Sequence, residues 1–284
     1  MKRVALMVYL LSTASIVYGQ QQNELSDSLL NTHLQEIEVI STRATRTTPV
    51  AYTNIDKEKL QKQNLGKDLG AGIGYTSIRV RGTDGTRINV TANGIPINDS
   101  ESHTVFWVNL PDFASSVKDM QVQRGAGTST NGAGAFGASI NMQTGELVAE
   151  PYVTFNGSYG SFNTHKETLK LGTGLIDERW SFDARLSNIS TDGYIDRASV
   201  GLNSYYLQGA YYDDHTSIKL ITFAGKEQTY HAWNYASKEE MEMYGRRYNS
   251  CGYMYTDENG QMHFYDDQTD NYVQKNWQLL FNHQ

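Results

Sequence analysis

Three side chains of types that bind metal ions lie close together in one polar loop, Asn98-Asp99-Ser100-Glu101-Ser102-His103. Asp99, Glu101 and His103 offer the oxygen and imidazole donors that metal ions accept in proteins. Three such residues at alternate positions of a loop form a solvated turn more often than a binding site. The loop is therefore a candidate for ligand contact, and the sequence predicts neither a resident metal nor another cofactor.

A second pattern, Gly132-x-Gly134-x-x-Gly137, matches the GxGxxG spacing of nucleotide-binding loops. That fingerprint needs a strand immediately before it and a helix that opens on it. Here the strand-like run Ser139–Gln143 follows the glycines, and no GK[ST] sequence occurs. Close backbone approach and left-handed turns explain these glycines better than phosphate binding.

The composition excludes several classes of protein. The 284 residues carry a formal net charge of −7, which disfavours a nucleic-acid binder that works through bulk charge. The single cysteine, Cys251, excludes an intramolecular disulfide and a multi-thiol zinc site. No Ser-His-Asp, paired-carboxylate or zinc spacing indicates an enzyme. A polar β protein with 25 glycines and 19 tyrosines remains.

The N-terminus has the form of an export signal. Two basic residues precede the apolar run Val4–Leu11, which leads through small residues to Gly19. A positively charged n-region, an apolar h-region and small residues at the cleavage site predict a secretory signal peptide at residues 1–19. The alternative is a buried N-terminal helix, but nothing amphipathic follows. The mature chain would begin near Gln20, and export with one cysteine favours a Gram-negative envelope.

The second half of the chain predicts long antiparallel strands. Period-two alternation places them at 151–161, 164–174, 179–190, 201–213, 215–227 and 271–283. Short connections at Ile176–Glu178 and Asp214 alternate with long ones at Thr191–Val200 and Gln228–Asp270. Membrane barrels have short turns on one side and long loops on the other, whereas a soluble β-sandwich shares only the alternation. We favour the barrel, with these side chains facing lipid: Trp180, Phe182, Tyr205, Leu207 and Tyr211.

Six strands are too few for such a barrel, because the smallest membrane barrels need about eight. An open edge in lipid would leave several kcal/mol unsatisfied for each backbone group. We therefore expect a truncated chain, in which residues 151–284 form only the first strands of a longer barrel.

The middle of the chain carries five motifs that together are specific for one family. They are Ile78–Gly82, Arg87–Val90, Asn93–Ile97, Val117–Gly125 and Gly132–Asn141. In order and spacing they resemble the plug domain of TonB-dependent outer-membrane receptors, and they look like the iron-complex receptors of Bacteroidetes. The resemblance implies an α+β plug domain at residues 49–145, followed by antiparallel β-strands of an incomplete outer-membrane β-barrel. In the family the complete barrel has 22 strands.

The resemblance also assigns a coupling segment. Within a periplasmic stretch at residues 20–48, Glu36-Ile37-Glu38-Val39-Ile40-Ser41 resembles the TonB box. An extended segment rich in β-branched residues can add as a strand to a partner's sheet edge. The implied partner is TonB, working with ExbB and ExbD in the periplasm. The alternative is an ordinary first strand of the plug.

A plug–barrel latch is a further implication of the resemblance. Arg81 and Arg124 match two plug arginines that face glutamates on the barrel wall of the family. A guanidinium group suits a bidentate carboxylate pair, and the glutamates would lie beyond residue 284. Arg79 alternates with Arg81 around Val80, so we expect both on one face. The alternative is that these arginines are ordinary exposed charges.

Together these features predict transport. In the family the outward plug loops touch the ligand, which makes Asp99, Glu101 and His103 candidates, and the aromatic-rich segment 228–270 resembles a ligand-catching loop. We expect an outer-membrane receptor, embedded in outer-membrane lipid, that imports a scarce metal complex resembling an iron–siderophore by TonB-coupled transport. Alternatives are a non-energised barrel or adhesin, and a non-functional receptor fragment.

Overall fold

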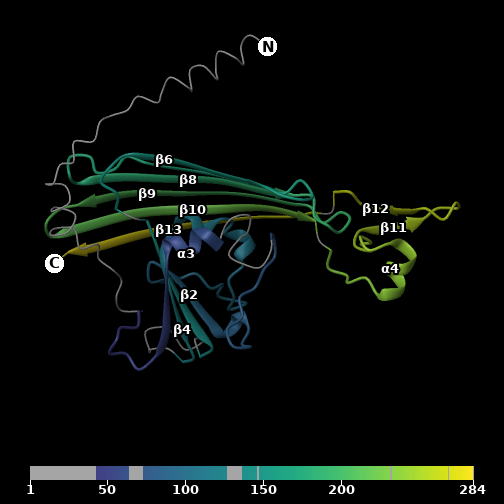
Figure 1. Cartoon of the computed structure of the whole chain (residues 1–284), viewed down its shortest axis with the longest axis horizontal. Coiled ribbons are helices and arrows are strands. Elements are labelled where there is room, and N and C mark those ends of the chain that lie inside the picture. The colour runs from purple at the N-terminus through teal and green to yellow at the C-terminus, as the bar shows by residue number, and fades with distance from the viewer. Residues whose placement is uncertain are drawn as a thin grey trace, which may run out of the picture. The chain divides into compact units, whose positions relative to one another are not determined.

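The computed structural model describes residues 43–63, 73–126, 136–145, 147–230, 232–267 and 269–283, which all belong to one compact unit (Figure 1). The predicted signal peptide and the segment Glu36–Ser41 lie outside the described residues. In the described part of the chain, no helix is both long enough and apolar enough to cross a membrane.

The first part of the described chain is a five-stranded mixed sheet with strand order β1-β4-β5-β2-β3. Its strands are β1 (Ala51–Asp56), β2 (Ile88–Ala92), β3 (Ile95–Pro96), β4 (Val117–Arg124) and β5 (Ala138–Thr144). β2 and β5 are parallel and the other pairs are antiparallel. The helical elements are α3 (Lys57–Gln63) and the 3-10 helices η2 (Gly85–Arg87), η3 (Trp107–Asn109) and η4 (Phe113–Ser116). The predicted α+β domain is confirmed.

Local sequence explains the turns of this domain. Asn93 and Gly94 join β2 to β3 with φ values of 55° and 80°, which is the left-handed geometry that an Asn-Gly hairpin favours. Ile78–Val80, in contrast, forms no strand: Val80 makes only an isolated bridge to Thr83. Arg81 follows with a φ of 52°, so the extended run ends there.

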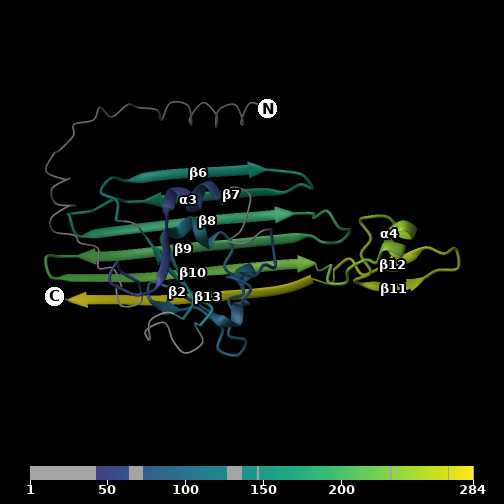
Figure 2. The same cartoon turned by 60° about the horizontal axis from the view of Figure 1, so that its bottom comes forward.

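The second half forms an open antiparallel sheet of six strands, which we call the wall (Figure 2). In order they are β6 (Tyr152–Tyr159), β7 (His165–Gly172), β8 (Trp180–Thr191), β9 (Val200–Tyr212), β10 (Thr216–Tyr230) and β13 (Thr269–His283). All six correspond to predicted strands. The connections at 160–164, 173–179, 192–199, 213–215 and 231–268 have 5, 7, 8, 3 and 38 residues, so the expected difference in length is clear only between the last two.

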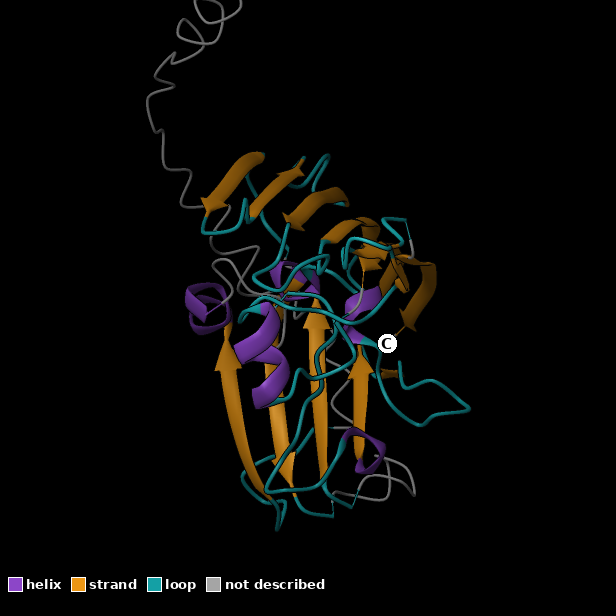
Figure 3. Cartoon of the chain, turned by 90° about the vertical axis from the view of Figure 1, so that its right-hand side faces the viewer, coloured by secondary structure: helices purple, strands orange, loops and turns teal. Residues whose placement is uncertain are grey.

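The two faces of the wall differ in chemistry. The register places Trp180 opposite Tyr211 and Leu186 opposite Tyr205, so the five predicted lipid-facing side chains share one face, the outward face. The opposite, inward face packs on the five-stranded domain of residues 43–145, which we call the plug after the domain predicted there. Figure 3 shows the wall strands crossing above the sheet of this domain. Phe223 of the wall lies 4.9 Å from Phe113 of the plug between ring centroids.

The segment between β10 and β13 contains structure that the sequence analysis treated only as a loop. It includes α4 (Lys238–Tyr244) and a hairpin of β11 (Tyr253–Thr256) and β12 (Met262–Phe264). Ser237 and Glu240 form a capping box at the start of α4, a signal that the sequence carries. Arg197, from the β8–β9 loop, stacks 3.6 Å from the Phe264 ring centroid and joins the two loops.

A pair of wall glycines tests the packing between plug and wall. A Cβ atom at Gly225 would collide with the Asn109 carbonyl and the Pro111 ring, whereas at Gly209 it would lie 3.4 Å from the Phe182 ring. We expect G225A to lower the free energy of unfolding by about 1–3 kcal/mol, because overpacking displaces the plug. G209A is the matched control. Equal urea-unfolding midpoints for the two variants would contradict the contact.

Candidate functional site

The plug meets the wall at a buried carboxylate, Asp112. This residue lies between η3 and η4 and is fully buried. Its φ of 53° is left-handed, a conformation that aspartate adopts more readily than most residues. Ser115 in η4 donates a hydrogen bond to Oδ1 at 2.6 Å, which fixes the carboxylate from the plug side.

Two cations and two hydroxyls of the wall hold the same carboxylate. Lys166 Nζ lies 2.6 Å from Oδ1, and Arg185 Nη1 lies 3.4 Å from Oδ2. The hydroxyls of Thr168 and Ser187 each donate to Oδ2 at 2.7 Å. Both carboxylate oxygens are therefore paired and hydrogen-bonded, as a buried charge requires. We call Asp112 and these four wall residues the clamp.

The wall also binds the backbone of the same turn. Arg185 donates to the Asp112 carbonyl at 2.8 Å, and the Ser204 hydroxyl donates to the Pro111 carbonyl at 2.7 Å. Strand alternation builds this pocket, because Thr168 of β7 pairs directly with Ser187 of β8. Every second residue of the two strands therefore points to the plug.

The clamp sets the protonation state of its carboxylate. Burial alone would raise the pKa of Asp112, but the charges of Arg185 and Lys166 and the hydrogen bonds outweigh burial. Together they hold the pKa well below its usual range, so the carboxylate stays ionised in the folded protein.

A second contact joins plug and wall without charge. Asn93 Nδ2 donates to Gln278 Oε1 at 2.8 Å and to Thr144 Oγ1 at 2.9 Å. Gln278 Nε2 donates to the Ala92 carbonyl at 3.3 Å, and the Tyr206 hydroxyl donates to Thr144 Oγ1 at 3.0 Å. The Asn-Gly turn of the plug is thereby attached to β13 and β9.

The predicted latch arginines lie away from the clamp. Arg124 donates to the Thr53 hydroxyl inside the plug sheet, and Arg79 and Arg81 are exposed. The left-handed φ of Arg81 means that the regular alternation expected for Arg79 and Arg81 ends at Val80. Among the described residues none of the three arginines forms an ion pair, and the latch to glutamates beyond residue 284 stays a prediction.

The predicted ligand loop is a hydrogen-bonded turn. Asp99 Oδ2 accepts from the amides of Ser102 at 2.7 Å and Glu101 at 3.2 Å, and these bonds, led by that of Ser102, lower the pKa of Asp99. The His103 amide donates to the Asp99 carbonyl at 2.9 Å. The described residues contain no group of three His, Cys, Asp or Glu that could hold a metal ion. Ligand contact by this loop stays a prediction.

Close backbone approach accounts for the last glycine of the GxGxxG pattern. A Cβ atom at Gly137 would lie 2.5 Å from Thr83 Oγ1 and 2.9 Å from the Arg87 carbonyl oxygen. Gly137 therefore allows two plug segments to meet, which agrees with the structural interpretation. Gly132 and Gly134 lie outside the described residues.

Sequence reasoning missed the clamp itself. Asp112 stands alone between Pro111 and Phe113 in an otherwise apolar stretch, which is a weak signal for a buried charge. The wall residues gave a stronger signal for a polar inward face. Arg185 and Ser187 belong to the polar half of the residues that alternate along β8. Neither signal alone indicates that these residues meet.

Comparison with known proteins identifies the first domain. Residues 44–139 match the family model described as TonB-dependent Receptor Plug Domain. The chain carries a TonB-dependent receptor plug. No curated protein sequence matches the chain.

Solved receptors share the fold of this plug-bearing chain. They include the ferric yersiniabactin uptake receptor FyuA from Yersinia pestis (TM-score 0.52, 14% identity), the ferric-catecholate import receptor Fiu from E. coli K12 (0.52, 18%) and P. aeruginosa FpvA bound to heterologous pyoverdines (0.51, 16%). The matches cover 66%, 64% and 65% of this chain and 34%, 28% and 26% of those chains, respectively. This chain therefore spans about a quarter to a third of their length.

Replacing the clamp carboxylate by its neutral isostere tests the charge balance. D112N keeps the shape of the side chain but leaves Lys166 and Arg185 buried without their counter-charge. We expect the free energy of unfolding to fall by about 3–5 kcal/mol at pH 7. D266N, in an exposed loop, is the matched control and should change unfolding little. Equal denaturant midpoints for D112N and D266N would show that the clamp does not stabilise the fold.

The low pKa of Asp112 also predicts a pH dependence. A carboxyl group whose folded pKa lies below the ordinary value of 3.8 stabilises the fold at higher pH and loses that effect as the pH falls. The difference in unfolding free energy between wild type and D112N should therefore be constant above about pH 5 and shrink below about pH 4. A difference that grows on acidification would contradict the assigned direction.

Proposed function

We propose that this chain belongs to an outer-membrane receptor that imports a scarce metal complex by TonB-coupled transport. The observation that carries the proposal is the clamp, in which a buried plug carboxylate is held by cations on the inward face of the wall. In a complete barrel, a domain held on the inward face in this way would occlude the lumen. The substrates named for the similar solved receptors, yersiniabactin, catecholates and pyoverdines, support an iron complex as cargo.

The outward face of the wall supports a place in lipid. Trp277, Leu279 and Phe281 of β13 are 67%, 66% and 65% exposed. Apolar patches of this extent on a protein surface mark a contact with a membrane or a partner. Together with the signal peptide proposed at residues 1–19, they favour the outer membrane, where strands alternate between lipid-facing apolar and lumen-facing polar residues.

The inward face is polar in part, and its polar contacts suit a plug that must move, although Phe113 and Phe223 also pack together there. A hydrogen bond between plug and wall can be exchanged for bonds to water at a small net cost, whereas separating an apolar contact loses its burial. We propose that pulling on Glu36–Ser41 transmits force to the plug. TonB, with ExbB and ExbD, supplies the pull after the segment adds as a strand to its sheet.

The ligand side of the proposed receptor lies at the longer loops. Tyr255 and His263 stack with ring centroids 4.6 Å apart, and Trp233 is 59% exposed. Such aromatic faces suit the planar groups of iron chelators. The turn at Asp99, Glu101 and His103 is the plug's candidate for contact with the same ligand.

Iron-limited growth tests this proposal. A strain that lacks the gene should fail to grow on at least one ferric siderophore as sole iron source, and the intact gene should restore growth. Val39→Pro should abolish the rescue while leaving surface binding intact, because proline removes a backbone donor from the added strand. Asn31→Pro, outside the segment, is the control. Uptake that survives V39P would exclude coupling through this segment and favour a non-energised barrel or adhesin.

A further inference from the structure

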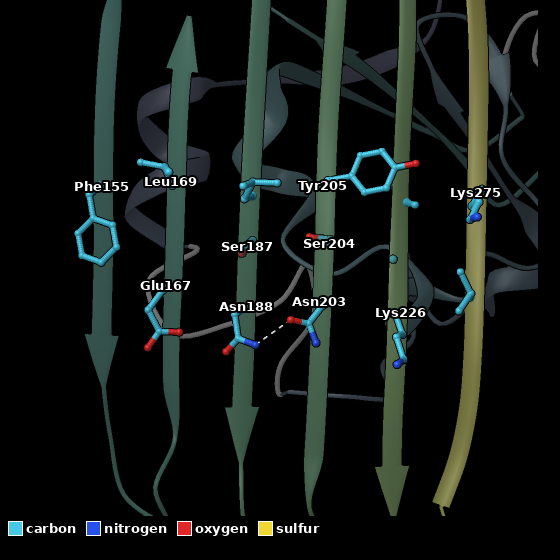
Figure 4. Close-up of a pocket in the computed structure, with 14 residues that line it drawn as sticks. Phe155, Glu167, Leu169, Ser187, Asn188, Asn203, Ser204, Tyr205, Lys226 and Lys275 are labelled. Carbon is cyan, nitrogen blue, oxygen red and sulfur yellow. Dashed lines mark hydrogen bonds between the residues drawn. The ribbon is translucent and has the colours of Figure 1, made fainter.

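On the outward face of the wall, the apolar band ends at one transverse line of polar side chains. We call this line the boundary row: Glu167, Asn188, Asn203 and Lys226. The register pairs each member with the next across β7, β8, β9 and β10, and Figure 4 shows the four side chains in line. Asn188 Nδ2 donates to Asn203 Oδ1 at 2.9 Å, so the row is internally connected.

The boundary row lies most of the height of an apolar band away from the opposite end of the band. On β10 the outward positions run from Ile218 through Leu220 to Ala224 before the chain reaches Lys226. The nine residues from 218 to 226 span about 26 Å along the strand at about 3.3 Å per step. With the strand tilt of about 35–45° in outer-membrane barrels, this length covers about 20 Å of an apolar band that is about 25 Å tall. The row therefore falls near the edge of such a band, on the side of the longer loops.

Two lysines stand together at this edge. Lys226 pairs with Val273, which places Lys275 on the same face as a diagonal neighbour two residues along β13. Diagonal Cβ atoms lie about 7–8 Å apart. At that distance, two long side chains can both reach one anion. Both lysines are exposed, and in the described part of the chain neither forms an ion pair. Glu167 is three strands from Lys226, or about 14 Å.

An apolar groove of about 510 Å³ adjoins the two lysines. Its floor follows the next transverse row, in which Phe155 pairs with Leu169, Leu169 with Leu186, and Leu186 with Tyr205. Figure 4 shows the Tyr205 ring directed toward β10, where Ala224 pairs with Tyr205 and is buried. The groove thus has an apolar floor and, at its edge, the two ammonium groups of Lys226 and Lys275.

We propose that this groove binds one lipid whose phosphorylated head group carries a net negative charge. The ammonium groups of Lys226 and Lys275 hold the phosphate, and an acyl chain lies over Leu186 and Tyr205. Charge complementarity favours this occupant, because two neighbouring cations on an apolar surface repel each other until an anion lies between them. The proposal rests on the proposed function in one respect, namely that the outward face lies in lipid.

Trp277 provides a reporter for the test. It lies two residues from Lys275 on the same face and is 67% exposed. The full chain in detergent micelles would be titrated with brominated-acyl phosphatidylglycerol or phosphatidylcholine. Quenching of Trp277 would be isolated by subtracting the signal of W277F. We expect phosphatidylglycerol to quench at lower concentration, by roughly fivefold for each lysine.

Variants assign that preference to the lysines. K226Q/K275Q should lose it, whereas K226R/K275R should keep it because guanidinium groups also bind phosphate. K238Q, whose lysine is exposed on α4, is the matched control for general charge and should keep the preference. A preference that survives in K226Q/K275Q would overturn the site.

The outcomes separate this site from the function on which it rests. If neither lipid quenches Trp277, the outward face does not lie in lipid, and the membrane placement fails. If both lipids quench equally in the wild type, the membrane placement stands and the lipid site is wrong. Inorganic phosphate, compared with sodium chloride at equal ionic strength, should not displace phosphatidylglycerol. Displacement would mean that the lysines hold a free anion, which contradicts a lipid.

Discussion

The arrangement of plug and wall depends on the neutralisation of one buried charge. A carboxylate removed from water loses its hydration, and it stays ionised only where cations and hydrogen-bond donors replace the water. Asp112 meets this requirement through Lys166, Arg185 and three hydroxyl donors. The left-handed backbone of Asp112 and the polar side chains on the inward face of β7 and β8 both belong to this neutralisation of the carboxylate. The wall and the plug therefore fit each other chemically as well as sterically.

The same strands face two different surroundings. Their inward residues contact the plug through hydroxyl, amide and ionic groups and through apolar side chains such as Phe223, whereas many of their outward residues are large and apolar. Because side chains alternate along a strand, the residues of one face can differ in chemistry from those of the other face. At the clamp, Thr168 and Ser187 point inward to the plug. One residue away, Leu169 and Leu186 point to the outward face. This separation gives the wall one face that binds the plug and another face that exposes an apolar band.

Much of the fold could be predicted because its signals are local. The alternation around Trp180 and Phe182 gave the wall strands and their outward face, and the Asn93-Gly94 pair marks a tight turn. The capping box of Ser237 and Glu240 was an equally local signal for α4, although it was not recognised. The expectation that Arg79 and Arg81 share one face by strand alternation fails locally, because the left-handed Arg81 ends the extended run.

The clamp could not be predicted, because it depends on long-range contacts. Asp112 meets Thr168 and Ser187 across 56 and 75 residues of sequence, and no local pattern specifies such a pairing. The family resemblance predicts plug cations facing the wall, whereas at the clamp the plug supplies the anion and the wall supplies the cations. The central claim is most directly tested by a double-mutant cycle between Asp112 and Lys166 that uses D112N and K166Q. The account predicts a favourable coupling free energy of about 1–3 kcal/mol at pH 7, and strictly additive effects of the two substitutions would contradict it.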